Sequence, residues 1–254
     1  MLNQTYGNLE VIISDNCCTD NTMRIVSGYS DPRIVIHRNS ENIGLVGNFR
    51  KVLTYATGKY MMFLGSDDLI DLRAVEKCVA VLEDPSNQDI QLVNTFIRII
   101  NDESRVIATK KFIFGRGRIS SWWAIRSTLF AGFNIIGEPN GSLFRRSAYE
   151  KIPEPKFRNG DRWTLDMDMK NELFLLGASY MIPEALGMFR ISSQSNSNKN
   201  LRFEQAKLYR LYAWKVFRDK RYGLSFFWVI TATINSLFAQ IMRNLFYILF
   251  IKNK

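Results

Sequence analysis

The stretch Tyr60-Met61-Met62-Phe63-Leu64-Gly65-Ser66-Asp67-Asp68 decides the fold of this chain. A largely apolar run comes first, and a turn with two adjacent carboxylates follows it. A short continuous apolar run bounded by turn residues predicts a buried strand, and in open parallel sheets ligands bind beyond the carboxyl ends of such strands. Adjacent carboxylates in a crevice of low dielectric favour water or a divalent cation beside them. The sequence therefore predicts a ligand site at Asp67 and Asp68.

A second interpretation gives the same carboxylates a purely structural role. Asp residues are preferred caps at helix N-termini, and a helix is predicted to begin near Arg73. Asp68 or Asp71 could cap that helix. The dipeptide alone does not separate the two interpretations, so the rest of the chain has to decide.

Composition narrows the class of protein. The chain has 254 residues, of which 46% are hydrophobic, enough for one sizeable domain with or without a small appendage. Its 34 Lys and Arg against 24 Asp and Glu give a net charge of +10, which suits nucleic acid, an anionic membrane or phosphorylated substrates. The sequence contains no helix-turn-helix, zinc-ligand spacing or base-stacking strand motif, so nucleic acid is not predicted as a partner.

Cysteine and histidine usage excludes several kinds of site. Cys17, Cys18 and Cys78 contain no C-x-x-C spacing and make no disulfide framework, which favours a reducing compartment. His37 is the only histidine, so a His-based zinc site, a Ser-His-Asp triad and a Cys-His pair are excluded. Acid–base chemistry would fall to carboxylates. The opening residues lack the basic and apolar segments of a signal peptide.

The order of predicted elements indicates an α/β fold. Strands are predicted at 10–14, 33–37, 60–64 and 90–96, and helices at 22–29, 45–56 and 74–82. The helix at 45–56 is amphipathic, with apolar residues recurring at helical spacing. Strands that alternate with helices imply crossover connections, and hence a mostly parallel central sheet flanked by helices.

In the second half of the chain the predicted strands and helices no longer alternate regularly. An antiparallel segment is predicted at 106–114, a Gly/Arg turn at 115–118, a helix around Trp122 and Trp123, a strand at 141–144 and a helix at 165–177. A polar linker near 196–200 predicts a boundary. We therefore expect a catalytic domain at 1–198 and a basic and apolar helical tail at 199–254.

The tail leaves three arrangements open. A basic helix is predicted at 201–221, and the segment 222–242 has 21 residues without a charge, close to the roughly 20 that span a bilayer. Asn235, Ser236 and Gln240 interrupt this segment. A spanning helix, a helix lying in the membrane interface and a helix packed on the sheet domain are therefore all compatible with the sequence.

Several short motifs follow one another in a fixed order along the chain. They lie at 15–22, 42–44, 58–60, 66–68, 137–139, 141–146, 165–168 and 183–186, with Arg190 after the last. In order and spacing they resemble the family 2 glycosyltransferases of GT-A fold, over residues 1–198. The resemblance implies a GT-A-like, Rossmann-like domain that moves a sugar from a nucleoside-diphosphate sugar to an acceptor hydroxyl, with inversion. It also implies Mg²⁺ or Mn²⁺ at the diphosphate.

The resemblance implies roles for individual donor-site residues. Asp68 matches the family's metal ligand, and Asp67 matches the carboxylate near the ribose. Asp15 and Asn16 match the pair that faces the nucleoside, although an Asx turn at the end of a strand is the structural alternative. Arg190 matches a residue that closes over the diphosphate, whose oxygens a guanidinium can bind bidentately. A solvated surface charge is its alternative role.

The acceptor hydroxyl needs a base, and the resemblance places that base at Asp166. A carboxylate across the pocket from the leaving group would take the proton as the hydroxyl attacks. Asp166 lies eleven residues before Gly177, as the family's base precedes the glycine that ends its helix. Asp168 is expected to point elsewhere. Asp161 is the alternative base, and capping of the helix is the alternative role of Asp166.

The chain departs from the family pattern in two places. The family's opening strand should precede residues 2–6, and a domain without it would have unpaired sheet edges and weaker donor binding. Gly65 stands where many members carry the first carboxylate of an Asp-x-Asp motif. The metal would then rely on Asp68, the donor phosphates and water, a shell that Mg²⁺ tolerates.

The expected enzyme works at a membrane surface. Each Lys or Arg beside an apolar segment contributes roughly 1 kcal/mol of attraction to anionic lipid. We expect a cytoplasmic enzyme, attached peripherally or through its C-terminus to the inner face of the cytoplasmic membrane. It would extend a lipid-linked saccharide or polysaccharide of a bacterial cell envelope. The alternative is a catalytically inactive, truncated glycosyltransferase-like scaffold, which would bind no nucleotide.

Overall fold

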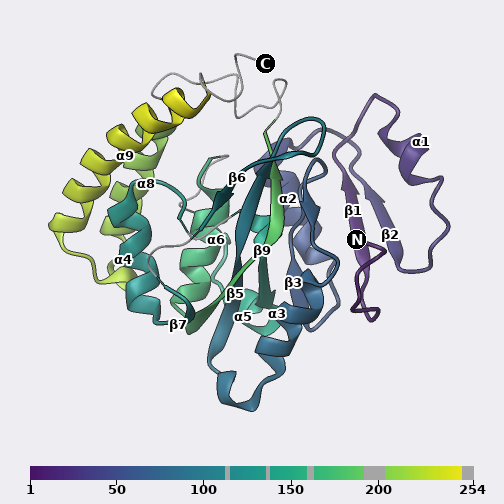
Figure 1. Cartoon of the computed structure of the whole chain (residues 1–254), viewed down its shortest axis with the longest axis horizontal. Helices are drawn as coiled ribbons and strands as arrows, with labels where there is room; N and C mark the ends of the chain where they lie inside the picture. Colours follow the sequence, from purple (N-terminus) through teal and green to yellow (C-terminus); the bar gives the residue numbers. More distant parts are fainter. Residues whose placement is uncertain (112–114, 136–137, 159–162, 192–203, 248–254) are drawn as a thin grey trace.

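The computed structural model describes residues 1–111, 115–135, 138–158, 163–191 and 204–247. These residues form two sheets flanked by helices (Figure 1). The smaller sheet pairs β1 (Val11–Asp15) with β2 (Ile34–Arg38). The larger sheet has the order β3-β8-β5-β9-β4, with β6 also on β5 and β7 also on β9. Its strands are β3 (Tyr60–Met62), β4 (Leu69–Ile70), β5 (Ile90–Ile100), β6 (Val106–Lys110), β7 (Gly117–Ile119), β8 (Ser142–Arg145) and β9 (Ala178–Arg190).

The α/β class is confirmed, but the prediction of a mostly parallel sheet is wrong for the larger sheet. Within the described residues, β5 and β9 are its one parallel pair, and the other strand pairs are antiparallel. The alternation of strands and helices correctly gives β3 and β5 the same direction. However, β8 comes from the second half of the chain and lies between them, antiparallel to both. The two strands therefore never pair with each other.

Strand β9 is central to the larger sheet and was not predicted from the sequence. It pairs with β5 along most of its length, and Ile182 and Ala185 lie opposite the consecutive residues Thr95 and Phe96. The two residues between them, Pro183 and Glu184, form a bulge. A proline cannot donate a ladder hydrogen bond and is tolerated in a strand at such irregularities. Because the Pro-Glu pair interrupts the strand pattern in the sequence, this long strand was not predicted.

The two faces of the larger sheet are covered by different helices. Successive residues of a strand point to opposite faces, so Val93 packs with helix α3 (Ala74–Glu83), whereas Leu92 joins the core on the other side. That second core also receives α2 (Gly44–Thr54), α4 (Ser121–Ala131), α5 (Arg146–Glu150) and α6 (Leu165–Phe174). The strand ends that carry the predicted site residues are thereby held between two helical layers.

The small sheet stands apart from the large one. Among the residues described, β1 pairs with β2 alone and β3 pairs with β8 alone, so the expected unpaired edges are present. Helix α2 links the sheets, because Ser14 Oγ donates to Asn48 Oδ1 at 2.7 Å and the Phe49 and Phe63 rings lie 4.2 Å apart. Helix α1 (Thr22–Val26) lies on the outer side of this sheet (Figure 1).

The C-terminal helices pack on the catalytic core. Helix α8 (Glu204–Arg218) places Tyr212 and Val216 in the same hydrophobic cluster as α6, and α9 (Phe226–Tyr247) packs against α8 and α4. Packing on the domain, one of the three arrangements left open for the tail, is observed, and it is compatible with a membrane interface at the outward face of α9. No helix in the described part of the chain is long and apolar enough to cross a membrane. The predicted boundary at 198/199 lies outside the described residues and stays a prediction.

Helix α9 docks through one close backbone contact at Gly132. This residue ends α4 with φ +74°, and a Cβ on it would overlap the backbone nitrogen of Ser236 in α9. We expect Gly132→Ala to lower the free energy of unfolding by about 3 kcal/mol, from left-handed strain plus overpacking. Gly223→Ala is the matched control, since Gly223 also has positive φ (+54°) but open space at its Cβ, and about 1 kcal/mol is expected. If urea denaturation showed that both variants lose the same free energy of unfolding, the proposed close contact at Gly132 would be contradicted.

Candidate active site

Asp68 is half-buried in a negatively charged environment just beyond β3. Its Oδ1 accepts a hydrogen bond from the Arg190 backbone N–H at 3.0 Å. Burial, with the negative charges of Asp67 and Glu138, raises the pKa of Asp68 to about 7, against the lowering effect of the Arg190 backbone hydrogen bond. The alternative role of helix cap does not apply, because α3 begins at Ala74 and Arg73 occupies its N-cap. The site has the excess negative charge that a cation would stabilise.

Gly65 lies directly against both carboxylates. A Cβ at this position would stand 2.9 Å from Asp68 Oδ2 and 3.2 Å from Asp67 Oδ1. A carboxylate at position 65 could not be accommodated unless both Asp side chains moved, which explains the departure from Asp-x-Asp. No group of three or more His, Cys, Asp or Glu side chains that could hold a metal ion occurs within the described ranges. The role of Asp68 as a metal ligand stays a prediction; its carboxylate is a hard oxygen donor of the kind that Mg²⁺ and Mn²⁺ accept together with phosphate and water.

Arg190 lies beside Asp68 as predicted, but its guanidinium points to backbone carbonyls. Nε donates to the Asp67 carbonyl at 2.8 Å, and Nη1 donates to the carbonyls of Asn101 and Asp102 at 2.6 and 3.1 Å. These bonds tie the end of β9 to the turn after β3 and to the β5–β6 turn. In this arrangement Arg190 positions the Asp67-Asp68 turn. Its predicted contact with a diphosphate stays a prediction.

Asp15 and Asn16 lie at the carboxyl end of β1 and make local contacts. The Asp15 side chain is buried, its Oδ1 accepts from Cys18 N at 2.9 Å, and its Oδ2 lies 3.1 Å from Arg38 Nε. The side-chain and backbone hydrogen bonds of Cys18 and the charge of Arg38 together lower the pKa of Asp15. Asp15 therefore closes a turn through the residue three positions on, whereas the Asx turn considered above would bond two positions on.

The Asn16 amide connects two loops. Its Oδ1 accepts from Ile43 N at 3.1 Å, and its Nδ2 donates to Asn42 Oδ1 at 2.9 Å. It thereby fixes the 42–44 loop against the end of β1. The predicted contacts of Asp15 and Asn16 with a nucleoside stay predictions, and the structure shows both residues shaping the loops around that position.

Asp166 is half-buried in the first turn of α6. It accepts a short hydrogen bond from Asn134 Nδ2, and burial together with the negative charge of Glu138 raises its pKa. Thr164 is the N-cap of α6. Asp168 is fully buried and therefore points elsewhere, as expected. The alternative base Asp161 lies outside the described residues.

Sequence analysis missed two charged groups that connect these carboxylates. Glu138 forms an ion pair with Lys110 at 3.1 Å, and its charge acts on both Asp68 and Asp166. The Lys170 side chain is fully buried, and its Nζ donates to the Glu138 carbonyl at 3.4 Å. Burial lowers the pKa of Lys170, while Asp166 and Glu138 oppose that effect. The sequence feature that could have identified Glu138 as a site residue was its position directly before the Pro139–Gly141 turn. Lys170 resembled any helical surface lysine.

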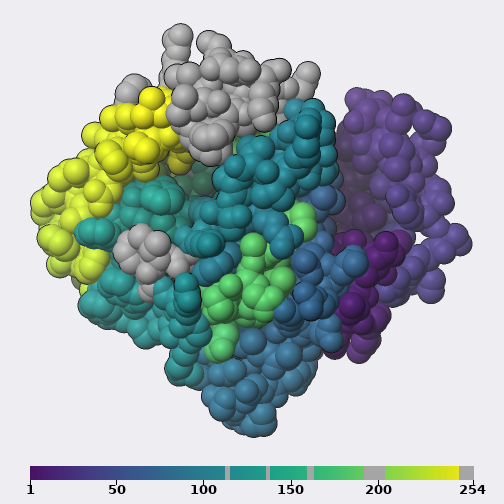
Figure 2. Space-filling model, viewed as in Figure 1, coloured from purple at the N-terminus to yellow at the C-terminus, as the bar shows by residue number. Residues whose placement is uncertain are grey.

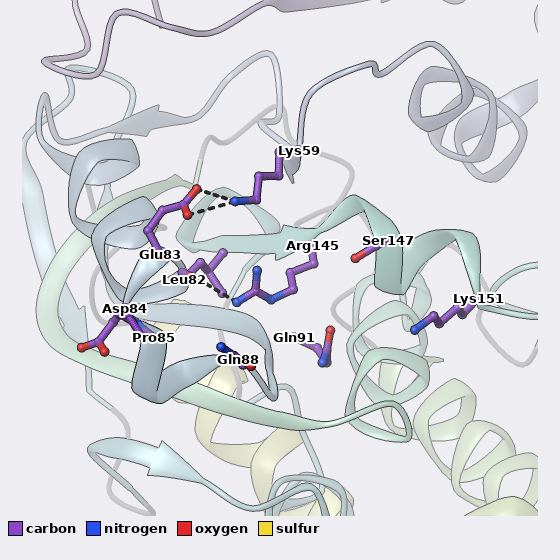
Figure 3. Close-up of a pocket in the computed structure, with 10 residues that line it drawn as sticks. All are labelled: Lys59, Leu82, Glu83, Asp84, Pro85, Gln88, Gln91, Arg145, Ser147 and Lys151. Carbon is purple, nitrogen blue, oxygen red and sulfur yellow. Dashed lines mark hydrogen bonds and ion pairs between the residues drawn. The ribbon is translucent and has the colours of Figure 1, made fainter.

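A cavity of about 470 Å³ lies at the opposite end of β3 and contains none of these carboxylates. Figure 3 shows its lining, where Lys59 is paired with Glu83 and the Arg145 guanidinium points to the end of α3. Arg145 donates to the carbonyls of Leu82 and Ile90 at 2.7 and 2.8 Å. These cations are engaged in holding α3 against the sheet, so the candidate active site is the carboxylate cluster.

The family described as Glycosyl transferase family 2 matches residues 1–152 of the chain. This chain belongs to glycosyltransferase family 2. It is 27% identical over 210 residues to EpsE of Bacillus subtilis, a protein named as a glycosyltransferase, across 80% of this chain and 69% of EpsE. It is 30% identical over 119 residues to the Escherichia coli protein WfgD, named UDP-Glc:alpha-D-GlcNAc-diphosphoundecaprenol beta-1,3-glucosyltransferase. That match spans 46% of each chain.

Solved structures of glycosyltransferases share the fold of this family 2 member. S. aureus TarS 1-349 superimposes with a TM-score of 0.61 at 16% identity, over 98% of this chain and 68% of that one. The mannosyltransferase PcManGT of Pyrobaculum calidifontis, solved with GDP-Man and Mn²⁺, gives 0.56 at 16% identity over 94% of this chain and 68% of PcManGT. The GT-A-like architecture predicted from the motifs is confirmed, and the chain is a glycosyltransferase that acts on nucleotide sugars.

Because the charge of Glu138 acts on Asp166, removing it should change the pH dependence of kcat. A base must be deprotonated, so its activity is lost as the pH falls through its raised pKa. Replacing Glu138 by Gln removes a negative charge that raises the pKa of Asp166, and we expect the acidic limb of kcat to move to lower pH by roughly one unit or less. Glu150→Gln, at an exposed glutamate paired with Arg146, should leave the limb unchanged. If Glu138→Gln left the acidic limb of the kcat profile at the same pH, Asp166 would be excluded as the titrating base.

Proposed function

We propose that this chain transfers a sugar from a nucleoside diphosphate to a hydroxyl of a lipid-linked saccharide or polysaccharide, with inversion and with a divalent cation. One observation carries the proposal. The charge of Glu138 acts on both Asp68 and Asp166, so the predicted metal ligand and the predicted base belong to one half-buried charged cluster. Such a cluster suits a reaction in which a diphosphate leaves on one side while a hydroxyl is deprotonated on the other.

On the donor side, Asp68 would hold Mg²⁺ or Mn²⁺. A bound divalent cation supplies Lewis-acid neutralisation of the charge that gathers on the leaving diphosphate. The presence of GDP-Man and Mn²⁺ in PcManGT supports this assignment. Asp67 would approach the ribose, while Asp15 and Asn16 shape the nucleoside side of the pocket. Arg190 would keep the Asp67-Asp68 turn in place through its backbone contacts.

On the acceptor side, Asp166 would act as the base. Its carboxylate accepts the proton of the acceptor hydroxyl as the hydroxyl oxygen bonds to the anomeric carbon. The bond between that carbon and the diphosphate oxygen breaks at the same time, and its electron pair leaves with the nucleoside diphosphate. A single displacement of this kind inverts the anomeric centre. Asn134 holds the carboxylate in position, and Lys170 and Glu138 set its charge environment.

Helix α9 supports a membrane-bound acceptor, because its apolar face is outward. Its buried residues are Val229, Ala232, Ser236 and Gln240, of which three are small or polar. Its exposed residues are all large and apolar: Phe226, Phe227, Ile230, Ile234, Leu237, Phe238, Ile241, Met242 and Leu245. A helix on a water-soluble surface has the opposite pattern, whereas a helix in the plane of a membrane interface buries such a face in lipid. In Figure 2 this helix forms one side of the molecule.

Basic residues accompany the apolar face. Helix α8 exposes Lys207, Lys215 and Arg218 near the indole of Trp214, which is 39% exposed. Lysine and arginine attract anionic lipid, and tryptophan favours the level of the headgroups. WfgD is named for an acceptor carried on diphosphoundecaprenol. We therefore place the enzyme on the inner, cytoplasmic face of the membrane, with a lipid-linked acceptor.

Nucleotide binding tests the donor site. UDP, GDP and dTDP, each with and without Mn²⁺, are compared by thermal shift on the wild-type chain and on Asp68→Asn. One of the nucleotides, at a concentration about 100 times its dissociation constant and with Mn²⁺ present, should raise the Tm of the wild type by about 5 °C or more. Asp68→Asn should lose this rise, and Asp84→Asn, at an exposed carboxylate, should keep it. A wild type that binds no nucleotide would instead indicate the inactive scaffold.

Vesicle flotation tests the membrane surface. The double variant Ile234→Glu, Phe238→Glu places charges on two α9 residues that are 61% and 65% exposed. Because each apolar side chain buried in lipid contributes about 2 kcal/mol, binding to phosphatidylglycerol-containing vesicles should fall at least about tenfold. The matched double variant Ile25→Glu, Tyr29→Glu alters two residues near α1 that are 58% and 61% exposed and should float like the wild type. Equal behaviour of the two variants would contradict the proposed surface.

A further inference from the structure

A small cavity of about 80 Å³ lies between the catalytic helix α6 and the C-terminal helices. Asn134, Trp163, Gln240 and Arg243 are among the residues that line it. Asn134 is also the side chain that donates to Asp166, so the cavity begins next to the proposed base. Its volume is roughly that of three water molecules, enough for one phosphate group but too small for a saccharide.

Arg243 brings a poorly paired guanidinium into this cavity. The side chain is half-buried, and within the described residues it makes one hydrogen bond, a long one of 3.4 Å from Nη1 to Gln240 Oε1, and no ion pair. Burial lowers the pKa of Arg243, and the charge of Glu138 opposes this effect. A guanidinium has five N–H donors in a planar fork that matches phosphate oxygens. Most of that capacity is unused by the protein.

The position of Arg243 on α9 is equally informative. Its neighbours on the helix, Met242 and Leu245, belong to the outward apolar face, whereas Ser236 and Gln240 line the cavity with it. Arg243 therefore stands where the lipid-facing side of α9 meets the catalytic pocket. The lining of the cavity brings Arg243 together with Trp163 and with Asn134, whose amide donates to Asp166.

We propose that Arg243 binds a phosphate group of the polyprenyl diphosphate that carries the acceptor saccharide. This assignment rests on the lipid-linked acceptor proposed above and adds the residue that recognises it. The polyprenyl chain would lie along α9 and the phosphate would enter the cavity, while the saccharide, which the cavity cannot hold, would extend outside it toward Asp166. Arg243 is thus a binding residue for the acceptor and has no part in bond breaking. A phospholipid headgroup presents the same chemistry and has to be distinguished by experiment.

Binding to nanodiscs tests the assignment without any transfer step. Discs of phosphatidylethanolamine and phosphatidylglycerol are compared with the same discs containing undecaprenyl diphosphate. The wild type should bind the diphosphate-containing discs about tenfold more tightly, since a charged hydrogen-bonded contact contributes on that scale. Arg243→Gln should lose this preference. Arg24→Gln, which removes the same charge from exposed α1, should retain it.

The other outcomes identify the alternatives. Retention of the preference by Arg243→Gln, or its absence from the wild type, would overturn the proposal. An equal loss of binding to both kinds of disc would assign Arg243 to phospholipid headgroups and would also overturn it. Arg243→Lys keeps the positive charge but loses the planar fork of donors. We expect its preference for the diphosphate-containing discs to lie between those of the wild type and Arg243→Gln. Nucleotide binding is measured on the same proteins, so a failure of the donor site is recognised separately from a failure at Arg243.

Discussion

The fully buried ammonium of Lys170 is the constraint around which the site is organised. A buried charge is tolerated only when it is paired and hydrogen-bonded. Glu138 supplies a backbone acceptor and a negative charge, and Asp166 supplies a second negative charge. The same Glu138 raises the pKa of Asp68 at the other end of the cluster. The requirement to neutralise one lysine therefore brings the predicted metal ligand and the predicted base into one electrostatic unit.

Helix α9 shows how the fold couples this unit to a surface. Its polar and small residues face α4 and α8, at a distance that Gly132 permits, and its large apolar residues face outward. Across this contact the Asn235 amide donates to the Phe130 carbonyl of α4, and within α9 the Ser236 hydroxyl donates to the Thr233 carbonyl. The outward face then needs an apolar environment. The same inverted pattern therefore underlies both the observed packing of α9 and the membrane binding that we propose.

The sequence predicted well what depends on local order and poorly what depends on distant partners. The apolar run before Asp67 and Asp68 and the order of the later motifs correctly predicted the α/β class and the family, whereas the role of Asp166 stays a prediction. Strand β9 was missed because Pro183 sits in a bulge that only pairing with β5 explains. The contacts of Arg190 were missed because its acceptors are backbone carbonyls of a distant turn, which no side-chain pattern records.

The central claim is that Asp68 and Asp166 serve one reaction from two sides of a single pocket. Anomalous diffraction from crystals grown with Mn²⁺ and the nucleoside diphosphate that binds would test it most directly. The account predicts one Mn²⁺ in direct contact with Asp68 and with the diphosphate, and a diphosphate whose sugar-bearing end points toward Asp166. A metal bound elsewhere, or a diphosphate pointing away from Asp166, would contradict the account.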